Sequence, residues 1–166
     1  PMKKSAYVIL LLLPILARAA QSPFDGTWKF ELPQPKPVRM LLRNGILQIP
    51  NLRIKIKADG TDQPVQALQS YDSMAVEVVD ERATETTYRK NGSVVASQKD
   101  TVSADGKTLT RELTYPEAGN QPDTPRFTFT RRAARPSGSH AISGVWIQQI
   151  PRFYTITYKS SPDGLA

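Results

Sequence analysis

Apolar and polar residues alternate along most of the chain after residue 24, which is the pattern of strands with one solvated face. The clearest case runs from Leu52 to Ala58, where apolar and basic residues alternate without a break. No ten-residue segment carries the helical i, i+3, i+4 spacing, although Pro64 to Tyr71 has room for a single helical turn. The pattern therefore predicts an all-β fold.

Asn-Gly pairs mark two of the expected hairpin turns. Asn44-Gly45 and Asn91-Gly92 each stand between two alternating segments, and both residue types adopt the positive φ angles that two-residue turns require. Together with Asp-Gly turns, these signals predict eight strands, at 26–32, 37–43, 46–57, 73–80, 82–90, 93–102, 107–115 and 126–132. An eight-stranded meander loses its exposed edges by closing into an antiparallel up-and-down barrel.

A short motif recurs along the chain. Gly26-Thr27-Trp28 returns as Gly144-Val145-Trp146, 118 residues later, which is about the length of one small barrel. Gly45 lies 17 residues after the first tryptophan, and Asp163 and Gly164 lie 17 and 18 residues after the second. We therefore expect a barrel over residues 24–135, a linker over 136–141, and over 142–166 the truncated start of a second copy.

The N-terminal residues have the composition of a signal peptide. Lys3-Lys4 precedes an apolar run from Ala6 to Leu16, and Ala17-Arg18-Ala19 has the small-x-small form of a cleavage site. The run is shorter than the roughly 20 residues of a membrane-spanning helix. We expect cleavage of residues 1–19, export to the periplasm or the medium, and no membrane span afterwards. An uncleaved anchor is the alternative.

Composition argues against several function classes. The chain has no cysteine, so its core has no disulfide to support it. The net charge of +7 is spread along the sequence instead of forming a dense basic face, so nucleic-acid binding is not expected. The single histidine, His140, falls in the linker, and no cluster of ligands suggests a metal. We assign no catalytic residue, metal or cofactor.

The first copy of the motif resembles a known signature. Phe24-Asp25-Gly26-Thr27-Trp28 resembles the Gly-x-Trp signature of lipocalins and their calycin relatives. In that family the tryptophan plugs one end of the barrel and an arginine near the end of the last strand packs across it. The resemblance implies that Trp28 and Arg131 form this plug, with Arg132 as the other candidate. It does not identify a ligand.

The chain is also similar to secreted bacterial proteins of unknown function that carry two such units. Three sequence segments carry that similarity: Ala58-Asp59-Gly60-Thr61-Asp62, Thr101 to Lys107, and Ser143-Gly144-Val145-Trp146. The similarity implies tandem barrels.

Strand parity identifies the residues that face the interior. The apolar inward sets are Trp28, Phe30 and Leu32; Leu52, Ile54 and Ile56; Met74, Val76 and Val78; and Leu109 with Leu113. The same parity places Gln98, Asp100 and Arg111 inside. A buried arginine requires a carboxylate neighbour or an anionic ligand; in the alternative, Arg111 and Asp100 pair in water at an open rim.

The candidate ligand-binding residues follow from this parity. They are Met74, Tyr88, Gln98, Arg111, Tyr115, Phe127 and Phe129. The direction of Tyr88 stays open, because its strand is polar on both faces: either Tyr88 points inward with Thr84 and Thr86, or Glu85 does with Thr87.

These features favour an exported, non-enzymatic barrel that binds a small apolar or amphipathic molecule in its interior. The first alternative is a structural or interaction module of the cell envelope with a filled barrel. The second is an enzyme that uses interior arginine, tyrosine and carboxylate groups. The sequence leaves the oligomeric state open.

Overall fold

The computed structural model describes residues 25–68, 70–116 and 124–159. The expected signal peptide, residues 1–19, lies outside them. The described residues divide into two compact units, one within Leu32–Arg152 and the other formed by residues 25–31 and 153–159. The strands are β1 (Gly26–Glu31), β2 (Val38–Arg43), β3 (Ile46–Ile49), β4 (Ile54–Lys57), β5 (Gln63–Leu68), β6 (Tyr71–Val78), β7 (Ala83–Lys90), β8 (Ser93–Val102), β9 (Thr108–Thr114), β10 (Arg126–Ala133), β11 (Gly144–Gln148) and β12 (Phe153–Tyr158).

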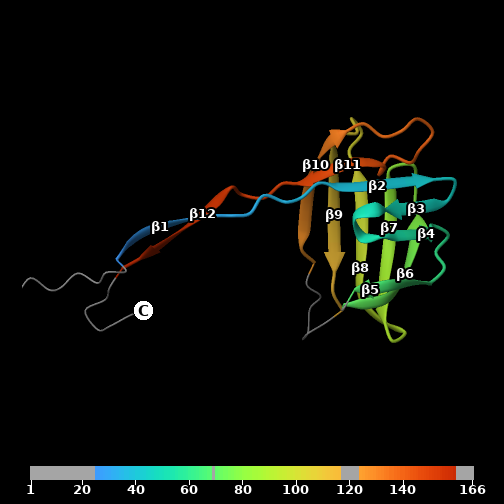
Figure 1. The fold of residues 1–166 in the computed structure, drawn as a ribbon, viewed down its shortest axis with the longest axis horizontal. Coiled ribbons are helices and arrows are strands. Elements are labelled where there is room, and N and C mark those ends of the chain that lie inside the picture. Colours follow the sequence, from blue (N-terminus) through green and yellow to red (C-terminus); the bar gives the residue numbers. More distant parts are fainter. Residues whose placement is uncertain (1–24, 69, 117–123, 160–166) are drawn as a thin grey trace, which may run out of the picture. The chain divides into compact units, whose positions relative to one another are not determined.

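The larger unit is one antiparallel sheet of ten strands that curls into a nearly closed barrel (Figure 1). Its strand order is β4-β3-β2-β11-β10-β9-β8-β7-β6-β5. Just beyond β4, Asp59 forms a bridge with Glu77, and the Gly60 N–H donates to the Val76 carbonyl in β6 at 2.8 Å. These contacts bring the two edges of the sheet together. The predicted all-β antiparallel barrel is confirmed as a fold class.

The strand count and one strand's place differ from the prediction. The expected eight-stranded barrel is wrong, because the sheet has ten strands, and the first Gly-x-Trp strand is not among them. β1 pairs instead with β12 in a separate two-stranded sheet. β11, which carries the second Gly-x-Trp, lies between β2 and β10. The barrel therefore takes its first strand from the second copy of the motif.

Two local features account for the other extra strands. The predicted strand 46–57 is broken by a 3-10 helix, η1 (Pro50–Leu52), after which Arg53 takes a left-handed φ of 55°. Proline lacks the N–H that a ladder needs and suits the first turn of a helix, so the break falls at Pro50. The segment that had room for a single helical turn, Pro64 to Tyr71, instead supplies most of the strand β5, Gln63–Leu68.

The Asn-Gly turns are confirmed. Asn44 and Gly45 have φ of 51° and 70°, and Asn91 and Gly92 have φ of 49° and 80°. Two consecutive positive φ angles are typical of the type I′ turn that suits the right-handed twist of two-residue hairpins.

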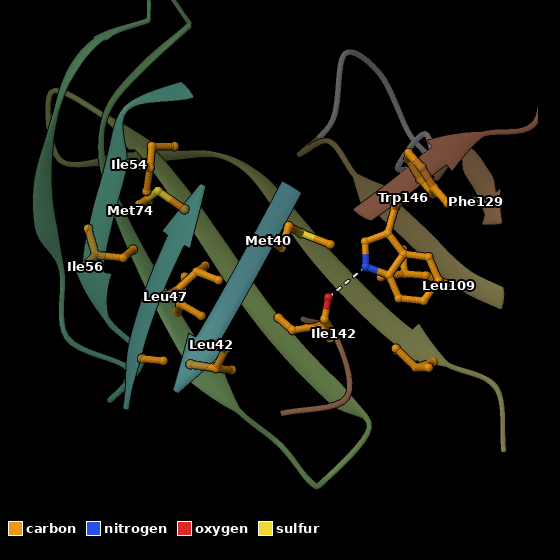
Figure 2. Close-up of a cluster of buried hydrophobic side chains, with 13 residues drawn as sticks. Met40, Leu42, Leu47, Ile54, Ile56, Met74, Leu109, Phe129, Ile142 and Trp146 are labelled. Atoms are coloured by element: carbon orange, nitrogen blue, oxygen red, sulfur yellow. Dashed lines mark hydrogen bonds between the residues drawn. The ribbon is translucent and has the colours of Figure 1, made fainter. Parts of the chain in front are cut away.

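The barrel encloses one apolar core (Figure 2). Its buried members are Met40, Leu42, Leu47, Ile54, Ile56, Ala58, Met74, Val76, Val102, Leu109, Phe129, Ile142 and Trp146. Parity is therefore correct for most inward sets. It is wrong for Leu52, which η1 leaves 47% exposed, and for Val78 at the end of β6, which is 39% exposed.

The segment expected to be a linker belongs to the larger unit. Residues 136–141 lie within Leu32–Arg152, where the His140 N–H donates to the Leu42 carbonyl at 2.9 Å. The hydroxyl of Ser143, which is fully buried, accepts from the Leu42 N–H at 2.9 Å. These bonds fix the chain against β2 immediately before β11 begins.

The smaller sheet is the antiparallel ribbon of β1 and β12. Its register pairs Gly26 with Tyr158 and Trp28 with Ile156. The rings of Phe30 and Tyr154 stack with their centroids 5.0 Å apart. The inward burial expected of Trp28 and Phe30 is wrong, since these residues are 47% and 40% exposed.

Candidate functional site

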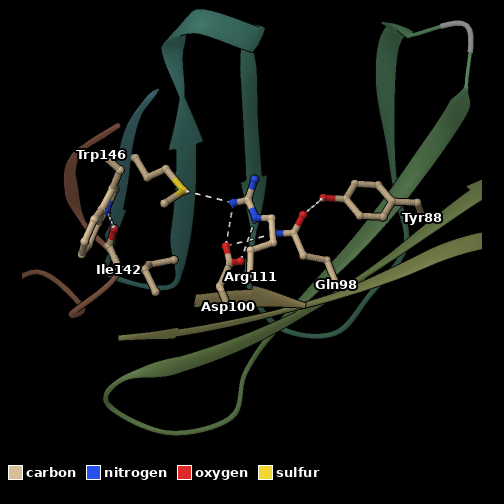
Figure 3. A network of polar contacts seen from close by, with 7 residues as sticks. Tyr88, Gln98, Asp100, Arg111, Ile142 and Trp146 are labelled. Atoms are coloured by element: carbon tan, nitrogen blue, oxygen red, sulfur yellow. Dashed lines mark hydrogen bonds and ion pairs between the residues drawn. The ribbon is translucent and has the colours of Figure 1, made fainter. Parts of the chain in front are cut away.

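A chain of polar side chains crosses the apolar interior (Figure 3). The Tyr88 hydroxyl donates to Gln98 Oε1 at 2.8 Å, and Gln98 Nε2 donates to Asp100 Oδ2 at 3.0 Å. The Arg111 guanidinium then donates from Nε and Nη2 to the two oxygens of Asp100, each at 2.8 Å. Each of these four side chains therefore has a hydrogen-bond partner within the series.

Strand register explains why these residues meet. Ala96, Gln98, Asp100 and Val102 alternate along β8 and face inward together. In the ladder between β8 and β9, Asp100 lies opposite Arg111, and directly opposed residues project from the same face of a sheet. Between β7 and β8, Thr86 lies opposite Gln98. With Thr84 and Thr86 both buried, the open question at β7 is settled: Tyr88 shares the inward face and Glu85 does not.

Asp100 is the partner that Arg111 requires. The Asp100 side chain is 4% exposed and that of Arg111 is 22% exposed, so the pair lies inside the barrel and the rim alternative is wrong. Burial alone would lower the pKa of the Arg111 guanidinium, but the hydrogen bonds and the charge of Asp100 raise this pKa above its ordinary value. Arg111 also lies over the Phe129 ring, 5.2 Å from its centroid, and its Nη2 is 3.9 Å from Met40 Sδ.

Tyr88 is the last side chain of this hydrogen-bonded series and lines a cavity. Its ring packs against Tyr71 with centroids 4.7 Å apart and a 54° tilt. Burial raises the pKa of the Tyr88 phenol well above its ordinary value, against the opposing effect of the Arg111 charge. Tyr88 therefore stays protonated at neutral pH and acts as a hydrogen-bonding group.

Two cavities lie along the polar chain. The larger has a volume of ≈ 320 Å³ and is lined by Ser70, Tyr71, Tyr88, Val95, Ala96, Gln98, Leu113 and Tyr115. The smaller, of ≈ 120 Å³, reaches Asp100 and Arg111 as well as the apolar side chains of β2, β3 and β4. Tyr71, Tyr88 and Gln98 line both, so these side chains stand between the two spaces.

The structure brings some of the predicted ligand-binding residues together and leaves others apart. Tyr88, Gln98 and Tyr115 line the larger cavity, and Arg111 lines the smaller. Met74 and Phe129 are buried members of the core, and Phe127 packs against that core. None of these three lines either cavity.

Sequence reasoning missed Tyr71. It lies three residues before Met74, so strict alternation places it on the opposite face from that buried side chain. Its ring nevertheless packs against Tyr88 and lines both cavities, which the alternation along this strand does not signal.

An arginine stacks on a buried tryptophan elsewhere in the barrel. The Arg131 guanidinium lies 4.0 Å from the Trp146 ring centroid and donates to the carbonyls of Ala141 and Ser143 at 2.8 and 2.5 Å. The fully buried Trp146 donates its indole N–H to Ile142 at 2.8 Å. The tryptophan that Arg131 contacts is therefore Trp146 in β11, and the expected partner Trp28 is wrong, because Trp28 lies in the β1–β12 sheet.

Gly144 makes this close approach possible. A Cβ at this position would lie 2.5 Å from Arg131 Nη1 and 3.0 Å from the Ala133 carbonyl, and the φ of +140° itself favours glycine. Along β9, Leu109 belongs to the core cluster that holds Trp146, whereas Leu113 lines the larger cavity. The plug and the cavity therefore lie toward opposite ends of the same strands.

Within residues 25–68, 70–116 and 124–159, no three His, Asp or Glu side chains form a group able to hold a metal ion. No helix within these ranges is long and apolar enough to cross a membrane. The histidine bonds to backbone: Ile142 N–H donates to His140 Nδ1 at 3.3 Å, and His140 Nε2 lies 2.6 Å from the Asp80 carbonyl.

No protein-family model, curated protein or solved structure matches the chain. The case for a function therefore rests on the geometry of the barrel.

Proposed function

We propose that the barrel is a non-catalytic, lipocalin-like carrier that binds a small, uncharged, amphipathic molecule in its larger cavity. One observation carries the proposal: a partly open pocket of ≈ 320 Å³, lined mostly by apolar and aromatic side chains, has the Tyr88–Gln98 pair in its wall. Small-molecule sites typically combine an apolar lining with a few placed polar groups, in volumes of about 300–1,000 Å³. The cavity lies at the small end of that range.

The lining favours a ligand with a ring and a hydrogen-bond donor. Tyr71, Tyr88 and Tyr115 offer aromatic faces, and Ala96 and Leu113 supply apolar contacts. The Tyr88 hydroxyl donates its hydrogen bond to Gln98 Oε1. Its oxygen still has lone pairs, which can accept a hydrogen bond from an N–H or O–H group of a ligand.

The charge state of the interior favours an uncharged ligand. Arg111 has both oxygens of Asp100 as partners, so its charge is already balanced. An anionic ligand would bring an unpaired charge into the barrel, and burying such a charge is costly. Of the two partners expected for a buried Arg111, a carboxylate or an anionic ligand, the Asp100 carboxylate leaves no need for the ligand.

The same groups argue against the enzyme alternative. A general base near neutral pH needs a pKa close to the working pH. Burial moves the pKa of the Tyr88 phenol away from that range, and the Asp100 carboxylate is fully occupied by Gln98 and Arg111. Both groups are better suited to fixing a ligand than to moving its protons.

We also propose that the protein acts outside the cytoplasm. The support is the charged, apolar and small-x-small succession of residues 1–19. An exported barrel with a partly open, largely apolar pocket fits carriage of a poorly soluble molecule.

The test is titration with two fluorophores that share one ring system. N-phenylnaphthylamine is neutral and carries an N–H, whereas anilinonaphthalene sulfonate adds a negative charge. We expect saturable enhancement of the neutral probe and binding of the sulfonate at least about tenfold weaker, a difference of 1.4 kcal/mol. Equal or tighter binding of the sulfonate would contradict the charge argument.

A matched pair of variants locates the site. Ala96 is 7% exposed and lines the cavity, whereas its neighbour Ser97 faces outward. Ala96→Phe fills the space and should abolish binding of the neutral probe, while Ser97→Phe adds the same ring outside and should leave it unchanged. Full binding by Ala96→Phe, or none by the unaltered protein, would favour the structural-module alternative.

A further inference from the structure

The pairing of β1 with β12 has the same register as the pairing of β11 with β2, once the 118-residue repeat interval is applied. In the barrel, Gly144 pairs with Met40 and Trp146 with Val38. In the ribbon, Gly26 pairs with Tyr158, and these positions are Gly144 moved back by 118 residues and Met40 moved forward by 118. Trp28 and Ile156 relate to Trp146 and Val38 in the same way. Each Gly-x-Trp strand is thus joined to the second strand of the other copy.

The backbone of the ribbon already has the form that the barrel uses. Gly26 has a φ of +142°, against +140° at Gly144. At Gly144 this conformation admits the Arg131 side chain, whereas a Cβ at Gly26 would meet nothing within 4 Å. The ribbon therefore has the glycine conformation that accommodates Arg131 at Gly144, and the space beside the Gly26 Cα is open.

One face of the ribbon is apolar and exposed. Trp28, Phe30 and the opposed Tyr154 and Tyr158 share a face by parity and register, and each is 40–47% exposed. Two strands alone cannot bury a core. In the barrel the equivalent face, which carries Trp146 and Met40, is buried.

The connections on both sides contain a matching proline. Pro33 follows β1 and Pro151 follows β11, again 118 residues apart. Proline holds the residue before it in extended conformations, which disfavours a tight hairpin from either strand back to its own neighbour. A segment held open in this way is suited to strand exchange.

We propose that β1 and β12 are the first two strands of a second barrel, whose remaining strands are another copy of those from β3 to β10. The two barrels then exchange first strands, and the last strand of the added copy places an arginine on Trp28 against Gly26. The occupant is a further repeat of this same kind. The identical register, the prepared glycine and the exposed apolar face all specify it.

The test extends the full chain by a second set of strands. Residues 44–135 are repeated directly after Ser161, the position equivalent to Arg43. This segment contains no tryptophan, so acrylamide quenching reports only Trp28 and Trp146. In the chain as it stands we expect one accessible and one protected tryptophan. In the extended chain we expect both to be protected.

Two further chains make the outcome decisive. Arg131→Ala made only in the added copy should return Trp28 toward its original accessibility. A longer addition, residues 44–149, brings its own Gly-x-Trp strand and so shows whether the added strands can fold. The proposal is overturned if Trp28 stays accessible in the first extended chain, above all if the longer addition folds.

Discussion

The Arg111–Asp100 pair provides a sharp test of the barrel interior. Replacing Arg111 by Met removes the guanidinium and leaves the Asp100 carboxylate with Gln98 alone in a site where the Asp100 side chain is 4% exposed. Breaking a buried ion pair in this way typically costs 3–5 kcal/mol. We expect a loss of about that size in the free energy of unfolding for Arg111→Met.

The opposite single variant should cost less. Asp100→Leu leaves Arg111 unpaired, but this side chain is 22% exposed and its long stem allows the charge to reach water. We expect a loss of about 1–3 kcal/mol, the range for a stranded polar group. The double variant Arg111→Met with Asp100→Leu replaces both charges by apolar groups of similar size, which is often neutral or stabilising for a buried pair.

The assay is urea unfolding of the four proteins, analysed as a double-mutant cycle. For a unit of this size each kcal/mol also moves the melting temperature by roughly 3–6 °C. Strong non-additivity, with the double variant at least about 2 kcal/mol more stable than Arg111→Met, is the expected result. Losses that add, or that stay below about 1 kcal/mol each, would show a pair solvated like a surface ion pair and would refute the reasoning.

Three further predictions concern the plug and the cavity wall. Trp146→Ala should lower the free energy of unfolding of the barrel by ~3–5 kcal/mol, the range for truncating a buried aromatic; a loss below about 1 kcal/mol in urea melts would contradict its burial. Gly144→Ala should cost about 1–3 kcal/mol, because its Cβ would meet Arg131 at a φ of +140°, whereas Gly26→Ala should leave the barrel's melting transition unchanged. Burial raises the pKa of Tyr88 above its ordinary value near 10. The unfolded chain therefore loses this proton at lower pH than the folded barrel does. The contribution of Tyr88 to stability is complete below about pH 10 and is lost as pH rises from there through the pKa of the folded state. Tyr88→Phe should make the alkaline fall in stability shallower, and an unchanged slope would contradict this.

Much of the barrel follows from local sequence signals. The Asn44-Gly45 and Asn91-Gly92 turns have the backbone angles that their residue types predict. Alternation along β8 and β9 placed Gln98, Asp100 and Arg111 correctly in the interior, because those strands pair without a shift. Where a strand is uninterrupted, its period of two identifies the buried face.

The errors in assigning buried faces arise where the structure departs from this simple alternation. Pro50 ends a strand that the alternation of neighbouring residues had made continuous, and its helix exposes Leu52. Tyr71 lines the cavity although it lies three residues before the buried Met74, a spacing at which simple alternation places it on the other face.

The largest error, the identity of the plug tryptophan, has a different cause. Both Gly-x-Trp strands carry the same local signal, so sequence pattern cannot decide which of them enters the barrel. The decision depends on contacts that come with Ile142 and Ser143, which are buried immediately before β11, and on the carbonyls that Arg131 binds there.

Hydrogen exchange of the two indole N–H groups tests the central claim most directly, since the chain has only two tryptophans. With ¹⁵N-labelled tryptophan, the N–H of Trp146, which is fully buried and bonded to Ile142, should exchange only when the barrel opens. Trp28 is 47% exposed and should exchange much faster. Trp28→Phe should therefore remove the fast signal and leave the slow one; loss of the slow signal instead would place the first Gly-x-Trp strand in the barrel and contradict the exchange of strands.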